Sequence, residues 1–165
     1  MLHLSIQASG MVTALGYSAP ATLAAIRAGI SAVGTVPWTD FESGERLRGA
    51  KVSLPHWWEG VGKLAELLAP AIHECLSGTP RIDPAAVPLL IGVADKSRAG
   101  RPARLDEQLL AELQARLEFP LHPRSGLFPA DQIGAVHGLH LAQDLIRTRV
   151  CDVAIVAGVD SFLQQ

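Results

Sequence analysis

Residues 129–163, PADQIGAVHGLHLAQDLIRTRVCDVAIVAGVDSFL, decide the fold class of this chain. Apolar side chains in the first half recur at steps of three and four residues, which predicts an amphipathic helix of about five turns. A strand is expected at about residues 152–158, and its apolar character on both faces is typical of a parallel strand between two helical layers. The stretch therefore predicts the centre of an α/β domain. The expected inward face of its helix holds Ile133, Val136, Leu139 or His140, and residues 142–146.

Composition and charge narrow the classes of function. The chain has 165 residues, 48% hydrophobic and 18% charged, which suffices for one domain with a core. A formal net charge of −2 gives no basic surface for nucleic acid or an anionic membrane, so neither is an expected partner. Two cysteines, Cys75 and Cys151, form no C-x-x-C pair, which favours a reducing, cytoplasmic location. The N-terminus lacks a signal-peptide pattern and no stretch is long enough to span a membrane, so neither secretion nor membrane insertion is expected.

The N-terminal third predicts a strand followed by a short helix. Residues 4–15 have the pattern of a strand interrupted at Gly10. Ser18 is the expected N-cap of a helix with Pro20 in its first turn and a stop at Gly29. The apolar face of this helix holds Leu23, Ile26 and Ile30.

Residues 34–59 are expected to be irregular, with a short strand at 50–54. Trp57 and Trp58 lie beside a proline in this region. They have two interpretations: they stack on a ligand, or they close an edge of the core.

Two leucine-rich helices and a second buried strand complete the predicted elements. Residues 60–77 and 105–117 carry apolar side chains at helical spacing, and residues 87–94 form a continuous apolar run. Cys75 falls on the apolar stripe of the first helix, which favours a core role, whereas Glu74 is expected to be solvated.

Two parts of the chain resemble one family. CDVAIVAGVDS at residues 151–161 is similar to the CD-x-A-x-x-GGV-x-S run of β-ketoacyl synthases of the thiolase superfamily, and the helix before it resembles their nucleophile helix. GMVTALGYSAPATLAAIRAGISAV at residues 10–33 resembles the opening of the same synthases. The resemblance implies one thiolase-like half-domain over residues 1–165, a mixed, mainly parallel sheet covered by helices, without its C-terminal half.

The same resemblance places Gln132 at the position of the family's catalytic cysteine, because His140, Leu141 and Ala142 match the family's HLA. A glutamine amide has no titratable proton near neutrality and cannot form a thioester. The resemblance therefore implies a divergent domain of acyltransferase ancestry without condensing activity, a pseudoenzyme that acts as a binding or scaffolding module in fatty acid or polyketide biosynthesis. Phe128 and Pro129 are expected to interrupt the strand that precedes this position in the family.

Two alternatives stay open. Loading synthases of some polyketide assembly lines carry glutamine at this position and decarboxylate malonyl thioesters. The same activity in this chain would need histidines from a missing C-terminal half. The GMVTALG and AAIRAGIS motifs also resemble accessory proteins of bacterial secretion loci. His137, His140 and Asp144 share one helical face, but three such side chains on one helix are a weak metal site, so no metal and no cofactor are predicted.

The expected partners follow from the resemblance and from one basic loop. Residues 95–104 follow a buried strand and contain Lys96, Arg98 and Arg101, which could bind an anion such as a phosphopantetheine phosphate; a solvated loop without a partner is the alternative. An acyl carrier protein or an acyl thioester is therefore a candidate partner. A lone half-domain would also expose the face meant for its second half, which predicts a dimer or association with a C-terminal half.

Overall fold

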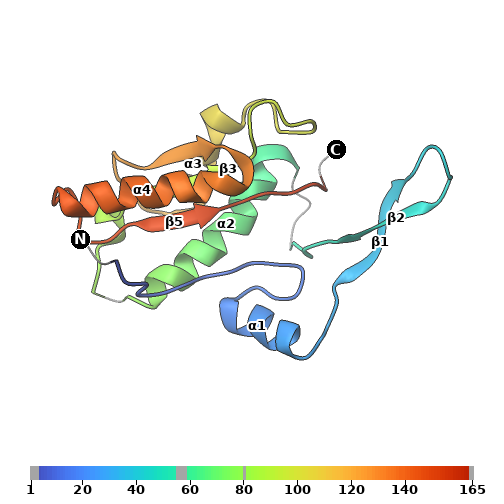
Figure 1. Ribbon diagram of the computed structural model, residues 1–165, viewed down its shortest axis with the longest axis horizontal. Helices are drawn as coiled ribbons and strands as arrows, with labels where there is room; N and C mark the ends of the chain where they lie inside the picture. The colour runs from blue at the N-terminus through green and yellow to red at the C-terminus, as the bar shows by residue number, and fades with distance from the viewer. Residues whose placement is uncertain (1–3, 55–58, 80, 164–165) are drawn as a thin grey trace.

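The computed structural model describes residues 4–54, 59–79 and 81–163 and confirms an α/β fold (Figure 1). Among these residues a parallel sheet has the strand order β4–β3–β5, with β3 at Leu89–Val93, β4 at Gly126–Pro129 and β5 at Ile155–Gly158. Every residue of the central strand β3 is buried, as its continuous apolar sequence predicts. A short 3-10 turn, η1 at Pro84–Ala86, precedes it.

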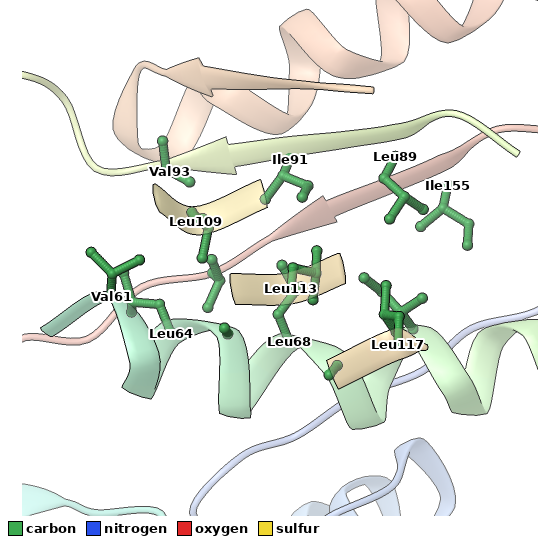
Figure 2. Packing of buried hydrophobic residues seen from close by; sticks show 14 of the residues in the cluster. Val61, Leu64, Leu68, Leu89, Ile91, Val93, Leu109, Leu113, Leu117 and Ile155 are labelled. Atoms are coloured by element: carbon green, nitrogen blue, oxygen red, sulfur yellow. The ribbon is translucent and has the colours of Figure 1, made fainter. Parts of the chain in front are cut away.

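Two leucine-rich helices cover one face of this sheet. They are α2 at Gly60–Ser77 and α3 at Leu105–Leu117, and their bounds are those that the sequence periodicity predicts. Figure 2 shows side chains of both helices directed at Leu89, Ile91 and Val93 of β3 and at Ile155 of β5. The inward leucines of α3 are at most 2% exposed, namely Leu105, Leu109, Leu113 and Leu117. This is the main hydrophobic core.

The helix α4, at Gly134–Arg147, covers the other face of the sheet (Figure 1). It is shorter than predicted because the chain first continues β4 to Pro129 and then makes a 3-10 turn, η2, at Asp131–Ile133. The expectation that Phe128 and Pro129 interrupt the strand is wrong. Proline is compatible with this position because it ends an edge strand, where one side of the backbone needs no partner within the sheet.

The predicted inward face of α4 is confirmed at Ala142 and Leu145 and is wrong in the N-terminal half of the helix. Its buried residues are Gly134, Gly138, Ala142 and Leu145, whereas Ile133, Val136 and Leu139 are 57%, 48% and 50% exposed. The cause is the close approach of α4 to the sheet. A Cβ atom on Gly134 would lie 2.5 Å from the carbonyl oxygen of Phe128, so only glycine fits there.

The N-terminal region forms less regular structure than predicted. Over residues 4–15, all of which are described, no strand forms, and an isolated bridge joins Thr13 to Gly16. The predicted helix is confirmed as α1 at Ala19–Arg27: the Ser18 side chain accepts a hydrogen bond from the N–H of Ala21, and Gly29 has a φ of 69°. Its expected apolar face is not buried, however, because Leu23, Ile26 and Ile30 are 44%, 55% and 59% exposed.

A carboxylate from α2 holds this region in place. Glu74 accepts hydrogen bonds from the N–H of Met11 at 2.9 Å and from the N–H of Ala19 at 2.9 Å. The expectation that Glu74 is solvated is therefore wrong. Its negative charge lies at the N-terminus of α1, where unpaired N–H groups and the helix dipole favour an anion.

The region predicted to be irregular contains a β-hairpin. β1 at Val33–Thr39 pairs antiparallel with β2 at Arg46–Ala50, and in Figure 1 the hairpin projects away from the parallel sheet. The strand expected at residues 50–54 is absent beyond Ala50 among the residues described there. Trp57 and Trp58 lie outside the described residues. Within the described chain, no helix combines the length and the hydropathy that crossing a membrane requires.

Candidate functional site

The carboxyl ends of the three parallel strands converge on one arginine. In sheets of this type ligands bind beyond the carboxyl ends of the strands. Arg98, in the loop after β3, forms a bidentate ion pair with Asp160, which lies beyond the end of β5. Its Nη1 also lies 3.5 Å from Oδ1 of Asp131, beyond the end of β4. The Phe162 ring centroid lies 4.8 Å from the guanidinium carbon. We call Arg98, Asp131, Asp160 and Phe162 the Arg98 clamp.

The positive charge of Arg98 is paired within the clamp rather than free for a ligand. The hydrogen bonds from Arg98 lower the pKa of the Asp160 carboxyl, against a smaller opposing effect of burial. The bond to Asp160 likewise raises the pKa of the guanidinium, whose side chain is only 18% exposed. Its Nε is buried and has no hydrogen-bond partner among the described residues. The clamp therefore ties three loops together through one positive and two negative charges.

Asp131 lies at a strained corner between strand and helix. Its φ of 45° is in the left-handed region, which is uncommon for a residue other than glycine. Its Oδ1 accepts a hydrogen bond of 2.9 Å from the N–H of Asp95 in the loop after β3. A sharp turn of this kind presents one side chain at the carboxyl edge of a sheet. In this chain that side chain is an aspartate.

Gln132, the predicted counterpart of the family's cysteine, follows this corner by one residue. It is exposed and lies within η2 rather than at the start of α4, where Ile133 is the N-cap. The structure thus places the glutamine beyond the carboxyl end of β4, next to Asp131 of the Arg98 clamp. Among the described residues, no hydrogen bond fixes its side chain.

The basic loop lies at the same edge, and each of its predicted anion ligands faces a carboxylate. Arg98 pairs within the clamp, and Arg101 binds Asp106 and donates to the carbonyl oxygen of Ala94 at 2.9 Å. Lys96 is 72% exposed and its Nζ lies 4.0 Å from the same aspartate. An anion would have to compete with these carboxylates, and Lys96 is the group least committed to one.

The cysteines and histidines lie elsewhere. Cys75 is on the part of α2 distant from its start, and Cys151 precedes β5 at the opposite edge of the sheet. Partial burial raises the pKa of both thiols, so they stay protonated near neutrality. His137 and His140 are exposed on α4, and within the described residues no group of histidine, cysteine or carboxylate side chains could hold a metal ion.

Sequence reasoning missed the acidic half of this site. Asp95, Asp131 and Asp160 each lie two residues beyond the last residue of a strand, and this repeated placement was the available signal. Neither a search of protein families nor a search of curated protein sequences finds a match to this chain.

Proposed function

We propose that this chain is a divergent β-ketoacyl synthase-like domain without condensing activity, which acts as a binding or scaffolding module. The observation that carries the proposal is the orientation of α4. This helix turns its small residues toward its own sheet and its large apolar residues Ile133, Val136 and Leu139 outward. Such an apolar surface on a helix is typical of an interaction site.

The charge distribution of α4 supports the same proposal. No aspartate, glutamate, lysine or arginine occurs between Gln132 and Gln143, so the first ten residues of α4 carry no formal charge when their histidines are neutral. Two such surfaces can pack together without charge repulsion or buried unpaired charge. The occupant that fits is a second copy of this chain or a C-terminal half with a similar helix.

The chemistry of the strand ends argues against condensation. The side chain at the strained corner is Asp131, the predicted site residue Gln132 forms no thioester, and both cysteine thiols are protonated and lie elsewhere. The Arg98 clamp also occupies the position between the loops with charges that are already paired. Binding is therefore the better-supported role, with an acyl carrier protein as a candidate partner beside self-association.

Sedimentation velocity of the full chain tests the proposal. We expect a dimer or larger species, and we expect Val136→Asp to shift the chain to monomer, because it places a charge on the uncharged surface. Phe41→Asp is the matched control, because Phe41 is fully exposed in the hairpin turn and should leave association unchanged. A monomer at all concentrations that also fails to bind acyl carrier protein would contradict a binding role.

Turnover of malonyl acyl carrier protein tests the enzymatic alternative. A decarboxylase would release acetyl product without a covalent adduct, and Gln132→Ala would abolish that release. We expect no product and no adduct. Acetyl release that depends on Gln132 would replace the proposal with the decarboxylase.

A further inference from the structure

A groove of about 770 Å³ runs along the edge of the parallel sheet, away from the Arg98 clamp. Residues 4–10 form one wall and β5 with the residues before it forms the other. Side chains of α2, including Ile72 and Leu76, line it from one helical layer, and Leu139 and Ile146 of α4 line it from the other layer. The groove therefore lies where the next strand of the sheet would lie, between the same two layers of helices.

The β5 wall of the groove offers main-chain hydrogen bonds. The N–H of Ile155 donates to the carbonyl of Pro88 at 2.9 Å, and the N–H of Val159 donates to that of Gly92 at 3.1 Å. Because successive residues of a strand alternate in direction, the backbone groups of Val156 and Gly158 point to the opposite side, into the groove. Among the described residues no hydrogen bond to these groups is present, so β5 has an open edge.

The opposite wall has the sequence of a strand. Residues 4–9, LSIQAS, alternate apolar and polar side chains and carry no charge. Ile6 is 92% exposed, although it borders an apolar groove. In Figure 1 this segment runs in the same direction as β5, from the end of the molecule where the N-terminus lies. The segment is therefore suited to parallel pairing.

Charge and tethering both favour this segment as the occupant. Of the described residues that line the groove, only Asp152 is charged, and it is exposed at the rim, so an uncharged strand fits. The chain just after the segment is fixed: Gly10 lies directly against the backbone of Ala71, and Met11 bonds to Glu74. A segment anchored beside its site has a high effective concentration there, about millimolar for a short flexible tether.

We propose that residues 4–9 close the groove by pairing with β5 as a fourth, parallel strand, and that the arrangement described here is the open form. Closure gives Val156 and Gly158 main-chain partners and buries Ile6 between the helical layers. The sheet order then becomes β4–β3–β5 followed by residues 4–9. The segment acts as a strap, because any extended peptide that binds this edge must first displace it.

Residue-resolved amide hydrogen exchange of the full chain tests the proposal. We expect the amides of Val156 and Gly158 to exchange at least about tenfold more slowly than unstructured amides, at a rate independent of protein concentration. Ile6→Asp should accelerate exchange at these two amides and leave the β3-facing amides of Ile155 and Ala157 unchanged. Phe41→Asp is the control, because it adds the same charge at an equally exposed apolar position.

Three results would overturn the proposal. Val156 and Gly158 amides that exchange at unprotected rates in the wild-type chain would show that the edge stays open. Protection that Ile6→Asp leaves intact would show that another group covers the edge. Protection that rises with protein concentration, together with a dimer, would assign the edge to a second copy. The wild-type measurements do not depend on whether any variant folds.

Discussion

The helices α3 and α4 cover opposite faces of the same sheet in opposite ways. α3 buries its largest side chains, since Leu105, Leu109 and Leu113 are fully enclosed, whereas α4 buries two glycines, an alanine and Leu145 and leaves Val136 and Leu139 about half exposed. The helix with leucines inward obtains its stability within this chain. The helix with glycines inward lies close to the sheet and leaves Val136 and Leu139 available to another surface.

The largest loss of stability should come from removing a buried side chain of α3. Leu113→Ala removes a fully buried side chain from the centre of the core, and we expect it to lower the free energy of unfolding by about 2–5 kcal/mol. Chemical denaturation measures this change. Leu110, which is only partly buried, provides the control, because its alanine variant should lose clearly less stability.

On the α4 side, adding atoms rather than removing them should destabilise the fold, because the helix packs directly against the backbone of the sheet. Gly134→Ala adds a Cβ atom 2.5 Å from a backbone oxygen of β4 and 2.9 Å from Cα of Gly92, so backbone must move, at a cost of about 1–3 kcal/mol. Gly126→Ala is the matched control on β4, because its Cβ would meet nothing within 4 Å. Equal denaturation midpoints for the two variants would show that α4 does not pack as closely as described.

The Arg98 clamp joins the loops between these two sides and should give a smaller, pH-dependent effect. Because the folded-state pKa of Asp160 is lowered, its contribution is present above the unfolded-state value of about 3.9 and is lost as pH falls through the folded-state pKa. Arg98→Ala should therefore reduce stability by about 1 kcal/mol at pH 7 and by less at acidic pH. Denaturation midpoints at pH 7 and pH 3 measure the difference. A loss that is the same at both values would mean that Arg98 acts through packing on Phe162 alone.

The elements that the sequence predicts well are those that bury large apolar side chains. The helices at 60–77 and 105–117 and the strand β3 have the expected places, because runs or stripes of leucine, isoleucine and valine have few alternatives to the core. In α4 two stripes compete, one small and one large, and periodicity alone favours the large one. The choice was made by the backbone contact between Gly134 and Gly92, which a sequence pattern does not express.

From the sequence, the residues of the candidate site could be assigned to loops and helices, but their contacts with one another could not be predicted. The sequence located Arg98 at the edge where strands end, because it follows the strand predicted at residues 87–94, whereas only the family resemblance singled out Gln132. It did not reveal that Arg98 pairs with Asp131 and Asp160, since those residues are 33 and 62 positions away along the chain. The hairpin over 33–50 was missed for a different reason: its strands are short and largely exposed, so they lack the apolar alternation by which a strand is identified.

The smallest effect on stability should come from the outward surface of α4, and this makes it the sharpest test of the comparison. Val136→Asp changes a side chain that is 48% exposed and does not line the groove beside β5, so the free energy of unfolding of the monomer should change by no more than about 0.5 kcal/mol. Leu109→Asp, the same change on the enclosed face of α3, should prevent folding, because it buries an unpaired charge. Denaturation at low protein concentration separates monomer stability from association. If Val136→Asp destabilised the monomer as strongly as a core variant, Val136 would face the interior, and the contrast between the two helices would be wrong.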